Sequence, residues 1–370
     1  MEWSEAGGLK VFRESPNPNG NLLDREGRLL TCRHGARDIV RTEEDGELTV
    51  LCDSFEGKRF NSPNDVAVKS DGTLWFTDPP WGLPRQRVGK EQPGHWVFRL
   101  DPETKEVRVL VKDLCMPNGL AFSPDERYLY IRNYMPHLGY NQPTAWPDSG
   151  EIRHDFYRMT NKEKMTAAQW HFAGPTRPVE ELYDCQADPQ NLKNLAGSEA
   201  HQKTLKRLRK AHRKHITQTV DLGFLPESEA WEMFSNKTGW ELGQGGQVKM
   251  APIHKAAAQV GMADESVLTK NLRSKNANVR YWGALGLAHH KALQIETKQL
   301  LRNALNDPSP AVRIEAANTL ARAGDPKPAI RALIKDLEHE NLIIVTHAAR
   351  TIELLGETAL AAKVPMAAAL

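Results

Sequence analysis

The chain has 370 residues, and its 49 basic and 47 acidic side chains nearly balance. Such a balance creates no long-range field that would favour nucleic acids or acidic substrates. The cysteines form no Cys-x-x-Cys pair, which disfavours a disulfide framework or a zinc site and favours buried or free thiols. They are Cys32, Cys52, Cys115 and Cys185.

The sequence carries no signal for a membrane or for export. No apolar run approaches the roughly 18 residues that a membrane-spanning helix needs. Residues 1–5 lack a basic or apolar leader pattern. We therefore expect a soluble protein of the cytoplasm with no membrane partner, and a length of this order allows two or three domains.

Repeated β structure is predicted for residues 8–131, where strand-like alternation is punctuated by Asp-Gly and Asn-Gly turns. A similar phrase begins at Asn19, Asn64 and Asn118, with spacings of 45 and 54 residues. This period is typical of four-stranded propeller blades. An Asn on the inner strand of each blade would direct its side chain toward one channel, where convergent oxygens suit a hard divalent cation.

The segments 58–72 and 76–83 resemble the gluconolactonase / senescence-marker / luciferin-regenerating family, and 30–35 and 117–125 match it too. The resemblance implies a six-bladed β-propeller that hydrolyses sugar lactones with a divalent metal in its central channel.

The resemblance also implies that Asn64 and Asn118 correspond to two of the four metal ligands. It makes Asn19, Asn61 and Asp65 candidate substrate-channel residues, with a sugar lactone as the expected ligand.

The family's first ligand, a Glu in a Glu-Gly-Pro strand, has no counterpart in this sequence. Its fourth ligand, an Asp of a later blade that is also the proposed general base, has none either. Two neutral amides would hold Ca²⁺ or Zn²⁺ weakly, because charge neutralisation dominates hard-cation affinity. The alternative is that Asn64 and Asn118 cap turns and satisfy local backbone groups. We assign no catalytic residue.

Residues 125–232 predict a strand at 181–184, a turn at 188–189 and an amphipathic helix at 199–215. The phrase 181–196 resembles the C-terminal subdomain of bacterial sulfatases of the heparan N-sulfatase type, which implies a sulfated saccharide as a second candidate ligand. Those enzymes need a Cys-x-Pro/Ala-x-Arg motif whose Cys becomes formylglycine. The nearest phrase, 115–119, has Gly119 in the place of Arg. We therefore expect no formylglycine.

The predicted helix is strongly basic over residues 203–215. One interpretation is a site for a sulfated polysaccharide or for nucleic acid. The other is a solvated helix face with Leu205 and Leu208 turned to the core. No aromatic residues are interleaved for base stacking, which disfavours a nucleic-acid partner.

The last third has helical periodicity and an internal repeat of about 32 to 33 residues, with copies at 279–287, 312–320 and 344–352. Residues 306–310 predict an N-cap and an N-terminal proline for the second copy's inner helix. The pattern resembles HEAT repeats, which implies a short solenoid that binds a protein partner. Packing alone is the alternative explanation of its Ala and Leu stripe.

We therefore expect a multidomain mosaic. A partial all-β propeller, with about two to three blades of a six-bladed fold, is predicted over 1–131. A small α+β sulfatase-tail segment follows over 132–232, then a linker over 233–250 and an all-α HEAT-repeat solenoid over 251–370. The change between the first two parts falls within residues 117–137.

Four functions follow from this organisation. The first is a metal-dependent sugar-lactone hydrolase with little or no activity, since both catalytic sites are incomplete. The others are a sulfatase fragment, a non-catalytic scaffold that binds a protein through its HEAT repeats, and a fusion of gene fragments without a function of its own. Whether the chain is an enzyme stays open, and both parent families are often exported.

Overall fold

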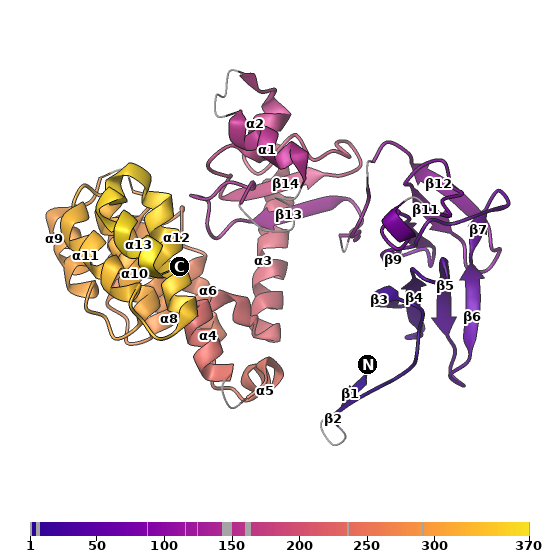
Figure 1. Cartoon of the computed structure of the whole chain (residues 1–370), viewed down its shortest axis with the longest axis horizontal. Helices are drawn as coiled ribbons and strands as arrows, with labels where there is room; N and C mark the ends of the chain where they lie inside the picture. The colour runs from indigo at the N-terminus through magenta and orange to yellow at the C-terminus, as the bar shows by residue number, and fades with distance from the viewer. Residues whose placement is uncertain are drawn as a thin grey trace. The chain divides into compact units, whose positions relative to one another are not determined.

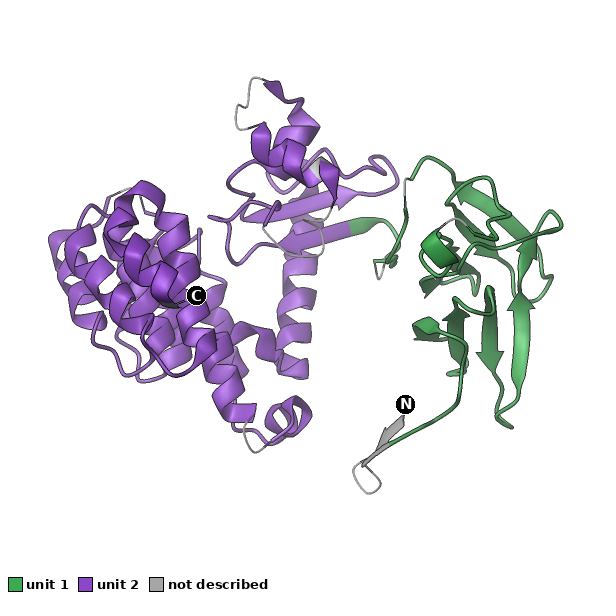
Figure 2. Ribbon diagram, viewed as in Figure 1, with its two compact units in different colours: residues 1–128 green, residues 129–370 purple. Residues whose placement is uncertain are grey.

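The computed structural model describes residues 2–4, 8–86, 88–114, 116–123, 125–142, 150–159, 164–234, 237–290 and 292–369. It contains two compact units, Met1–Tyr128 and Leu129–Leu370 (Figure 2). Cys115 and Pro124, which belong to motifs used above, lie outside the described residues.

The first unit opens with an antiparallel pair, β1 (Glu2–Ser4) and β2 (Gly8–Lys10). A four-stranded antiparallel sheet follows, in which neighbours along the chain are neighbours in the sheet. Its strands are β3 (Pro18–Leu23), β4 (Leu29–Arg33), β5 (Asp38–Thr42) and β6 (Leu48–Cys52).

A second four-stranded antiparallel sheet comes later in the same unit and has the same consecutive order. Its strands are β9 (Val66–Val68), β10 (Leu74–Thr77), β11 (Val97–Leu100) and β12 (Val107–Val111). A small hairpin of β7 (Ser54–Phe55) and β8 (Lys58–Arg59) precedes it, and the 3-10 turn η1 (Pro84–Gln86) lies between β10 and β11.

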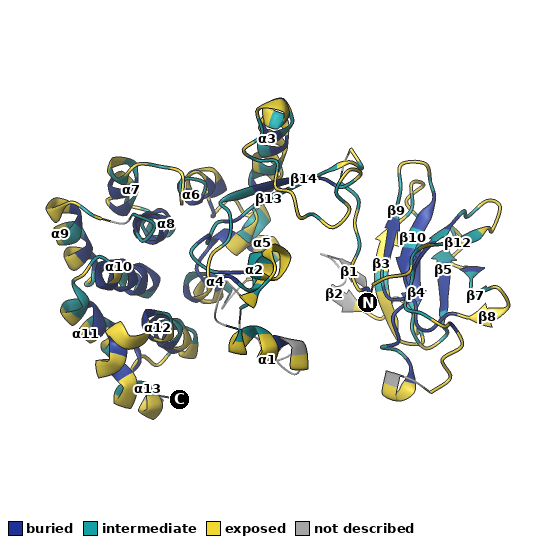
Figure 3. Cartoon of the chain, turned by 90° about the horizontal axis from the view of Figure 1, so that it is seen from above, coloured by how far each residue is buried: buried dark blue, intermediate teal, exposed yellow. Residues whose placement is uncertain are grey.

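One core serves both sheets, because apolar side chains of β4 and β5 cluster with those of β9, β10 and β11. At its centre the Phe60 ring meets Phe76 edge-on at 5.1 Å, and Phe76 stacks on Phe98 at 5.2 Å. Figure 3 shows which residues of these strands are buried. Two successive four-stranded meanders around a shared core are the arrangement of propeller blades, so the prediction of propeller-like β structure is confirmed.

The strand β13 (Tyr128–Arg132) starts at the last residue of the first unit, continues into the second, and pairs with β14 (Glu180–Asp184). The connection between them carries α1 (Glu151–Arg158) and α2 (Ala167–Ala173). Within the predicted join, residues 128–132 form this strand (Figure 1).

After β14 comes the basic helix α3 (Gln202–Thr219), preceded by the turn η4 (Glu199–His201). Its buried residues are Leu205, Leu208 and Ile216, which confirms the prediction that Leu205 and Leu208 face a core. Short elements lead on to the helical region: η5 (Leu222–Phe224), α4 (Glu227–Phe234), α5 (Gly239–Gln244) and α6 (Met250–Ala257).

Three helix pairs form the C-terminal region, and Figure 3 shows α7, α9 and α11 in one row and α8, α10 and α12 in the other. The pairs are α7 (Glu265–Leu272) with α8 (Ala277–Leu287), α9 (Ile295–Ala304) with α10 (Pro310–Arg322), and α11 (Pro326–Asp336) with α12 (Leu342–Leu355). The turn η6 (Gly356–Ala362) and α13 (Lys363–Ala369) complete the chain.

Capping and small residues explain why the pairs repeat. Asn276, Ser309 and Asn341 each cap one helix of the α8, α10 and α12 row, and Pro310 follows Ser309 as predicted. A Cβ on Gly283 would lie 2.6 Å from the Leu272 backbone N, so α7 and α8 approach this closely only with glycine there.

The predicted helical C-terminal region is confirmed, whereas the blade count and the sulfatase-type tail stay predictions. The two units divide at 128/129, and the finer boundaries at 232 and 250 also stay predictions. Cys32, Cys52 and Cys185 are free thiols. Within the described parts of the chain, no helix is long and apolar enough to cross a membrane.

Candidate functional site

The candidate site lies at one edge of the two sheets in the first unit. Asn19 stands near the start of β3 and His34 directly after the end of β4, so the antiparallel pairing brings them together. Asn64 and Asp65 directly precede β9, and Thr77 ends β10 beside them. Strand ends from both sheets therefore present polar side chains at a common edge.

His34 joins the two sheets. Its Nε2 atom lies 3.0 Å from Nδ2 of Asn19 and 3.2 Å from Nδ2 of Asn64. Burial lowers the pKa of His34, which favours the neutral ring. With the proton on Nδ1, the Nε2 lone pair accepts from the amide groups. The Oδ1 atoms of Asn19 and Asn64 then keep their acceptor capacity, since no donor among the described residues reaches them.

Asp65 and Asn118 belong to a second set of contacts beside His34. The Asp65 Oδ2 atom accepts from the Leu120 backbone N–H at 3.1 Å. The Thr77 hydroxyl donates to the Asn118 backbone oxygen at 2.7 Å and accepts from the Asp65 N–H at 3.2 Å. These bonds hold the segment from Asn118 to Leu120 against the β9–β10 edge, and the Asn118 side chain is left exposed.

Gly20 makes the close approach of β3 possible. Its backbone N–H donates to the Asn64 oxygen at 2.8 Å. A Cβ at this position would lie 2.6 Å from the Asp65 Cα atom and 2.7 Å from that oxygen. Only glycine fits without moving the backbone, so the Asn19-Gly20 pair is a requirement of the site's geometry.

Asn61 lies in a different network. It is buried, and its Nδ2 donates to the backbone oxygen of Asp78 at 3.2 Å and to the backbone oxygen of Gly94 at 2.9 Å. The Asp78 carboxylate accepts from the backbone N–H groups of Asn61 and Ser62, both at 2.8 Å. Burial raises the pKa of Asp78 to about 7. The structure brings Asn19 and Asn64 together through His34 but gives Asn61 no hydrogen bond to that group.

The oxygen atoms of Asn64, Asn118 and Asp65 suit a divalent cation only in part. Amide oxygens of Asn64 and Asn118 are hard donors, but both are neutral, and the nearby carboxylate of Asp65 already holds the Leu120 N–H. Among the described residues, no group of three or more His, Cys, Asp or Glu side chains has the arrangement of a metal site. The cation site at Asn64 and Asn118 therefore stays a prediction.

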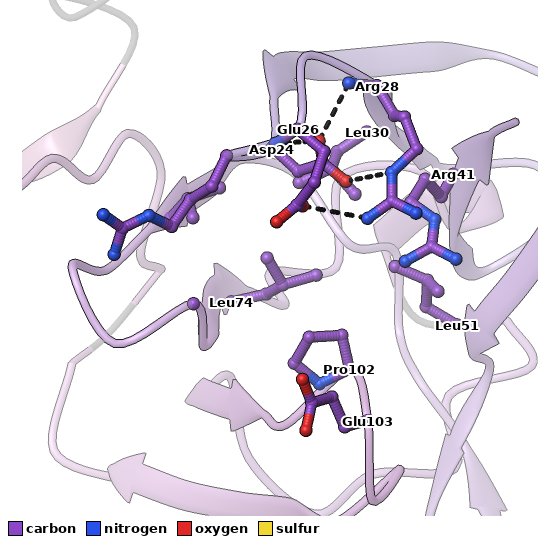
Figure 4. Close-up of a pocket in the computed structure, with 12 residues that line it drawn as sticks. Asp24, Glu26, Arg28, Leu30, Arg41, Leu51, Leu74, Pro102 and Glu103 are labelled. Atoms are coloured by element: carbon purple, nitrogen blue, oxygen red, sulfur yellow. Dashed lines mark hydrogen bonds and ion pairs between the residues drawn. The ribbon is translucent and has the colours of Figure 1, made fainter. Parts of the chain in front are cut away.

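A separate hollow lies at the other end of β4, where the strand begins (Figure 4). Its volume is about 140 Å³. Arg28 binds Asp24 at 2.8 Å and Glu26 at 2.9 Å there, and Arg41 binds Glu43 at 2.8 Å. Arg28 and Arg41 are therefore already paired with carboxylates in this part of the first unit.

His34 and Thr77 complete the group but were not among the predicted site residues. The Arg33-His34-Gly35 phrase was a signal for His34, since a histidine directly after a predicted strand lies at a sheet edge. Thr77 follows three apolar strand residues and has no comparable signal. Its role depends on contacts with a segment 41 residues away.

Family models match the two ends of the chain. Residues 1–167 match the SMP-30/Gluconolactonase/LRE-like region, and residues 265–353 match HEAT repeats. The chain is therefore a mosaic with a gluconolactonase-like region at its N-terminus and HEAT repeats at its C-terminus.

Individual proteins match parts of the chain. A gluconolactonase of Zymomonas mobilis is 39% identical over 125 residues, which cover 33% of this chain and 35% of that protein. An ulvan-active sulfatase of Formosa agariphila is 37% identical over 105 residues, with 28% of this chain and 18% of that protein covered, and this similarity falls in the middle of the chain. The chain thus spans about a third of the first relative's length and under a fifth of the second's.

Among solved structures, a gluconolactonase of Xanthomonas campestris is 44% identical, with 35% of this chain and 45% of that chain covered and a TM-score of 0.32. A putative gluconolactonase is 43% identical, with 34% and 45% covered and a TM-score of 0.31.

Proposed function

We propose that this mosaic chain is hydrolase-derived and that its N-terminal unit binds a sugar lactone. The observation that carries the proposal is the convergence of Asn19, His34 and Asn64 at one sheet edge, with two amide oxygens free to accept. A sugar lactone presents several ring hydroxyls and a carbonyl, and such groups are recognised by amide, hydroxyl and imidazole side chains. The gluconolactonase-like sequence of this region supports the same ligand class.

We further propose that turnover is slow or absent. Hydrolysis of a lactone adds water to the carbonyl carbon and breaks the ring C–O bond, so it needs a base near the water and positive charge near the carbonyl oxygen. Here one oxygen of the Asp65 carboxylate, Oδ2, accepts from the Leu120 N–H, the imidazole Nε2 of His34 lies between two amides, and no cationic side chain among the described residues takes part in these contacts. Binding is therefore better supported than catalysis.

A divalent cation belongs to this proposal as a weak ligand. Asn64 and Asn118 would hold Ca²⁺ or Zn²⁺ through their amide oxygens, with Asp65 as the nearby carboxylate. A bound cation would supply positive charge at a carbonyl oxygen.

The test is calorimetric titration of the full chain with gluconolactone, with and without Ca²⁺ or Zn²⁺, beside a hydrolysis assay corrected for the spontaneous reaction. We expect saturable binding, a rate close to background, and weaker binding in Asn64→Ala. Arg25→Ala, in the separate hollow at the start of β4, is the control and should bind as the wild type does. If Asn64→Ala and Asn118→Ala leave both binding and rate unchanged, the proposal is wrong.

A second candidate function is protein binding by the HEAT repeats. A cavity of about 690 Å³ is lined by α4, by the segment around His137 and by α8, α10 and α12. Its apolar rim includes Trp231 and Leu342, which are 57% and 75% exposed. In its wall the buried Glu315 carboxylate accepts from Asn318 at 3.3 Å and lies 3.1 Å from His347 Nε2. This combination suits a peptide with an apolar side chain beside a basic group.

This second candidate can be tested with a photo-crosslinking residue in place of Leu342 in the full chain. The matched control places the same residue at Ile295 on α9, which is 79% exposed but lies outside the cavity. We expect a defined partner at position 342 alone, with a lower yield when Glu315→Gln is added. Equal capture at both positions would contradict a partner site in the cavity.

A further inference from the structure

The basic face of α3 is part of a pocket in the second unit. The pocket has a volume of about 390 Å³ and lies between β13, α3 and the end of α6. Lys206, Lys210 and Arg213 contribute to it and are exposed, and their spacing of four and three residues places them on one face of the helix. A pocket of this size accommodates a small ligand.

The charges in this pocket do not balance. Five Lys and Arg side chains line it, against the single carboxylate of Glu180. That carboxylate is already matched, because Arg209 binds it through Nε at 2.8 Å and through Nη2, and the Tyr130 hydroxyl donates to it at 2.6 Å. Within the described residues, Lys206, Lys210 and Arg213 have no acidic partner. The pocket therefore presents a net positive surface.

Arg132 adds a fifth cation, and within the described residues its hydrogen bonds all go to neutral backbone oxygens. Its Nη1 donates to the Asn133 and Val179 oxygens at 2.5 and 2.9 Å, and its Nη2 donates to the Ala258 and Val260 oxygens at 3.1 and 2.8 Å. Burial lowers the pKa of this guanidinium. A partly buried charge without a direct counter-ion is costly, and an anion in the pocket would offset that cost.

The shape of the charge distribution indicates the ligand class. Lys206 and Arg213 are seven residues apart on one helix face, which separates them by about 10 Å along the axis at about 1.5 Å per residue. One carboxylate cannot meet both. His212 of α3 and His254 of α6 also line the pocket, and the Tyr134 hydroxyl lies 2.8 Å from His254 Nε2. These groups add uncharged hydrogen-bonding capacity.

We propose that this pocket binds a small molecule that carries two or more phosphate or sulfate ester groups. Such tetrahedral anions offer several acceptor oxygens each, which match lysine and arginine donors. The two tyrosines of the pocket do not favour a nucleic acid, because Tyr130 and Tyr134 are half-buried, both rings contact the His212 ring, and Tyr130 also binds Glu180. The site is separate from the lactone site, since it lies wholly in the second unit.

The test is calorimetric titration of the full chain with inositol hexakisphosphate, sucrose octasulfate, inorganic phosphate and a thymidine oligonucleotide. We expect the first two to bind at least about tenfold more tightly than inorganic phosphate, and binding to weaken as salt rises. Their relative affinities distinguish a phosphate ligand from a sulfate ligand. An oligonucleotide that binds more tightly than both would overturn the proposal in favour of a nucleic-acid surface.

Two double variants distinguish binding by the pocket residues from a general effect of the positive charge on α3. Lys210→Gln with Arg213→Gln removes two pocket cations, and we expect at least about a tenfold loss of affinity. Lys203→Gln with Lys214→Gln removes the same charge from exposed positions of α3 that do not line the pocket, and should bind nearly as the wild type does. Equal losses in the two pairs, or no loss in the first, would overturn the proposal. All four positions are exposed, so the fold should be retained.

Discussion

The imidazole of His34 lies 3.2 Å from the Asn64 side chain, measured between Nε2 and Nδ2. This contact joins the residue that follows β4 to the segment that precedes β9, so it connects the two sheets of the first unit. Since Asn19 approaches the same nitrogen at 3.0 Å, one neutral ring orients two amides. The geometry of the proposed lactone site therefore depends on the packing of the two sheets as well as on the side chains of the site.

Replacing His34 tests this dependence. In His34→Ala both amides lose their acceptor, and we expect gluconolactone to bind about tenfold more weakly, with the free energy of unfolding lowered by about 1–3 kcal/mol. Calorimetric titration and urea unfolding measure the two effects. His34→Gln, which returns an acceptor oxygen near the position of Nε2, should recover part of the affinity. Wild-type binding by His34→Ala would show that the ring does not orient the site.

Gly20 offers a test of the backbone approach itself. In Gly20→Ala the new Cβ would lie 2.6 Å from the Asp65 Cα atom. Backbone must then move, and we expect a loss of about 1–3 kcal/mol in the free energy of unfolding together with weaker lactone binding. Gly119→Ala is the matched control, because its nearest contact is the Asp65 Oδ2 atom at an ordinary 3.6 Å. Thermal unfolding should separate the two variants clearly, and equal melting temperatures would contradict the close packing.

Local signals predicted the architecture well. Turn glycines and alternating apolar residues indicated the β structure, and the Ser309-Pro310 pair indicated where α10 begins. The site was less predictable, because it depends on contacts between distant segments. Asn61 and Asn64 stand three residues apart in one motif, yet Asn61 is fixed by the oxygens of Asp78 and Gly94. No pattern within the motif distinguishes these two roles.

The same limit applies to the basic helix. Its sequence contains no aromatic residue between the lysines and arginines, and the tyrosines that line its pocket come from β13 and the residues just after it, about seventy positions earlier. The pairing of β13 with β14 brings them to α3. Charge along the helix was therefore visible in the sequence, whereas the pocket was not.

Asp78 should make the stability of the first unit depend on pH. Burial raises its pKa from 3.8 to about 7. Between these values the folded chain retains a proton that the unfolded chain has released, so the contribution of Asp78 to stability falls as pH rises through this window. Urea unfolding of the full chain, followed by tryptophan fluorescence across this range, measures the slope.

Asp78→Asn cannot titrate, so it should remove this part of the slope. Asp71→Asn is the control, because hydrogen bonding by Thr73 lowers the pKa of Asp71 to about 2 despite some burial, and its protonation lies below the window. If Asp78→Asn and the wild type have parallel pH profiles, Asp78 is already ionised in the folded chain near pH 4, contrary to this prediction.

Arg280 and Asp307 should stabilise the HEAT repeats more than a comparable surface pair does. Arg280 binds Asp307 with two hydrogen bonds, Nε to Oδ2 at 2.7 Å and Nη2 to Oδ1 at 2.8 Å, and its Nη1 donates to the Ser274 and Lys275 oxygens. Arg313 makes a similar link one repeat later, with a single hydrogen bond from Nη2 to Oδ1 of Asp336 and Nη1 bonds to the backbone oxygens of Asp307 and Pro308. Each arginine thus links one helix pair to the next.

Because the side chains of Arg280 and Asp307 are only 16% and 10% exposed, Arg280→Met leaves a poorly solvated carboxylate. We expect it to lower the free energy of unfolding by about 1–3 kcal/mol. Arg302→Met is the matched control, since the Arg302–Asp325 pair is 43% and 24% exposed and should contribute about 0–1 kcal/mol. Urea unfolding followed by far-ultraviolet circular dichroism measures both. A double-mutant cycle of Arg280→Met with Asp307→Asn should give a stabilising coupling energy between the two side chains. A coupling energy near zero would mean that Arg280 stabilises the fold only through its hydrogen bonds to the carbonyl groups of residues 274 and 275.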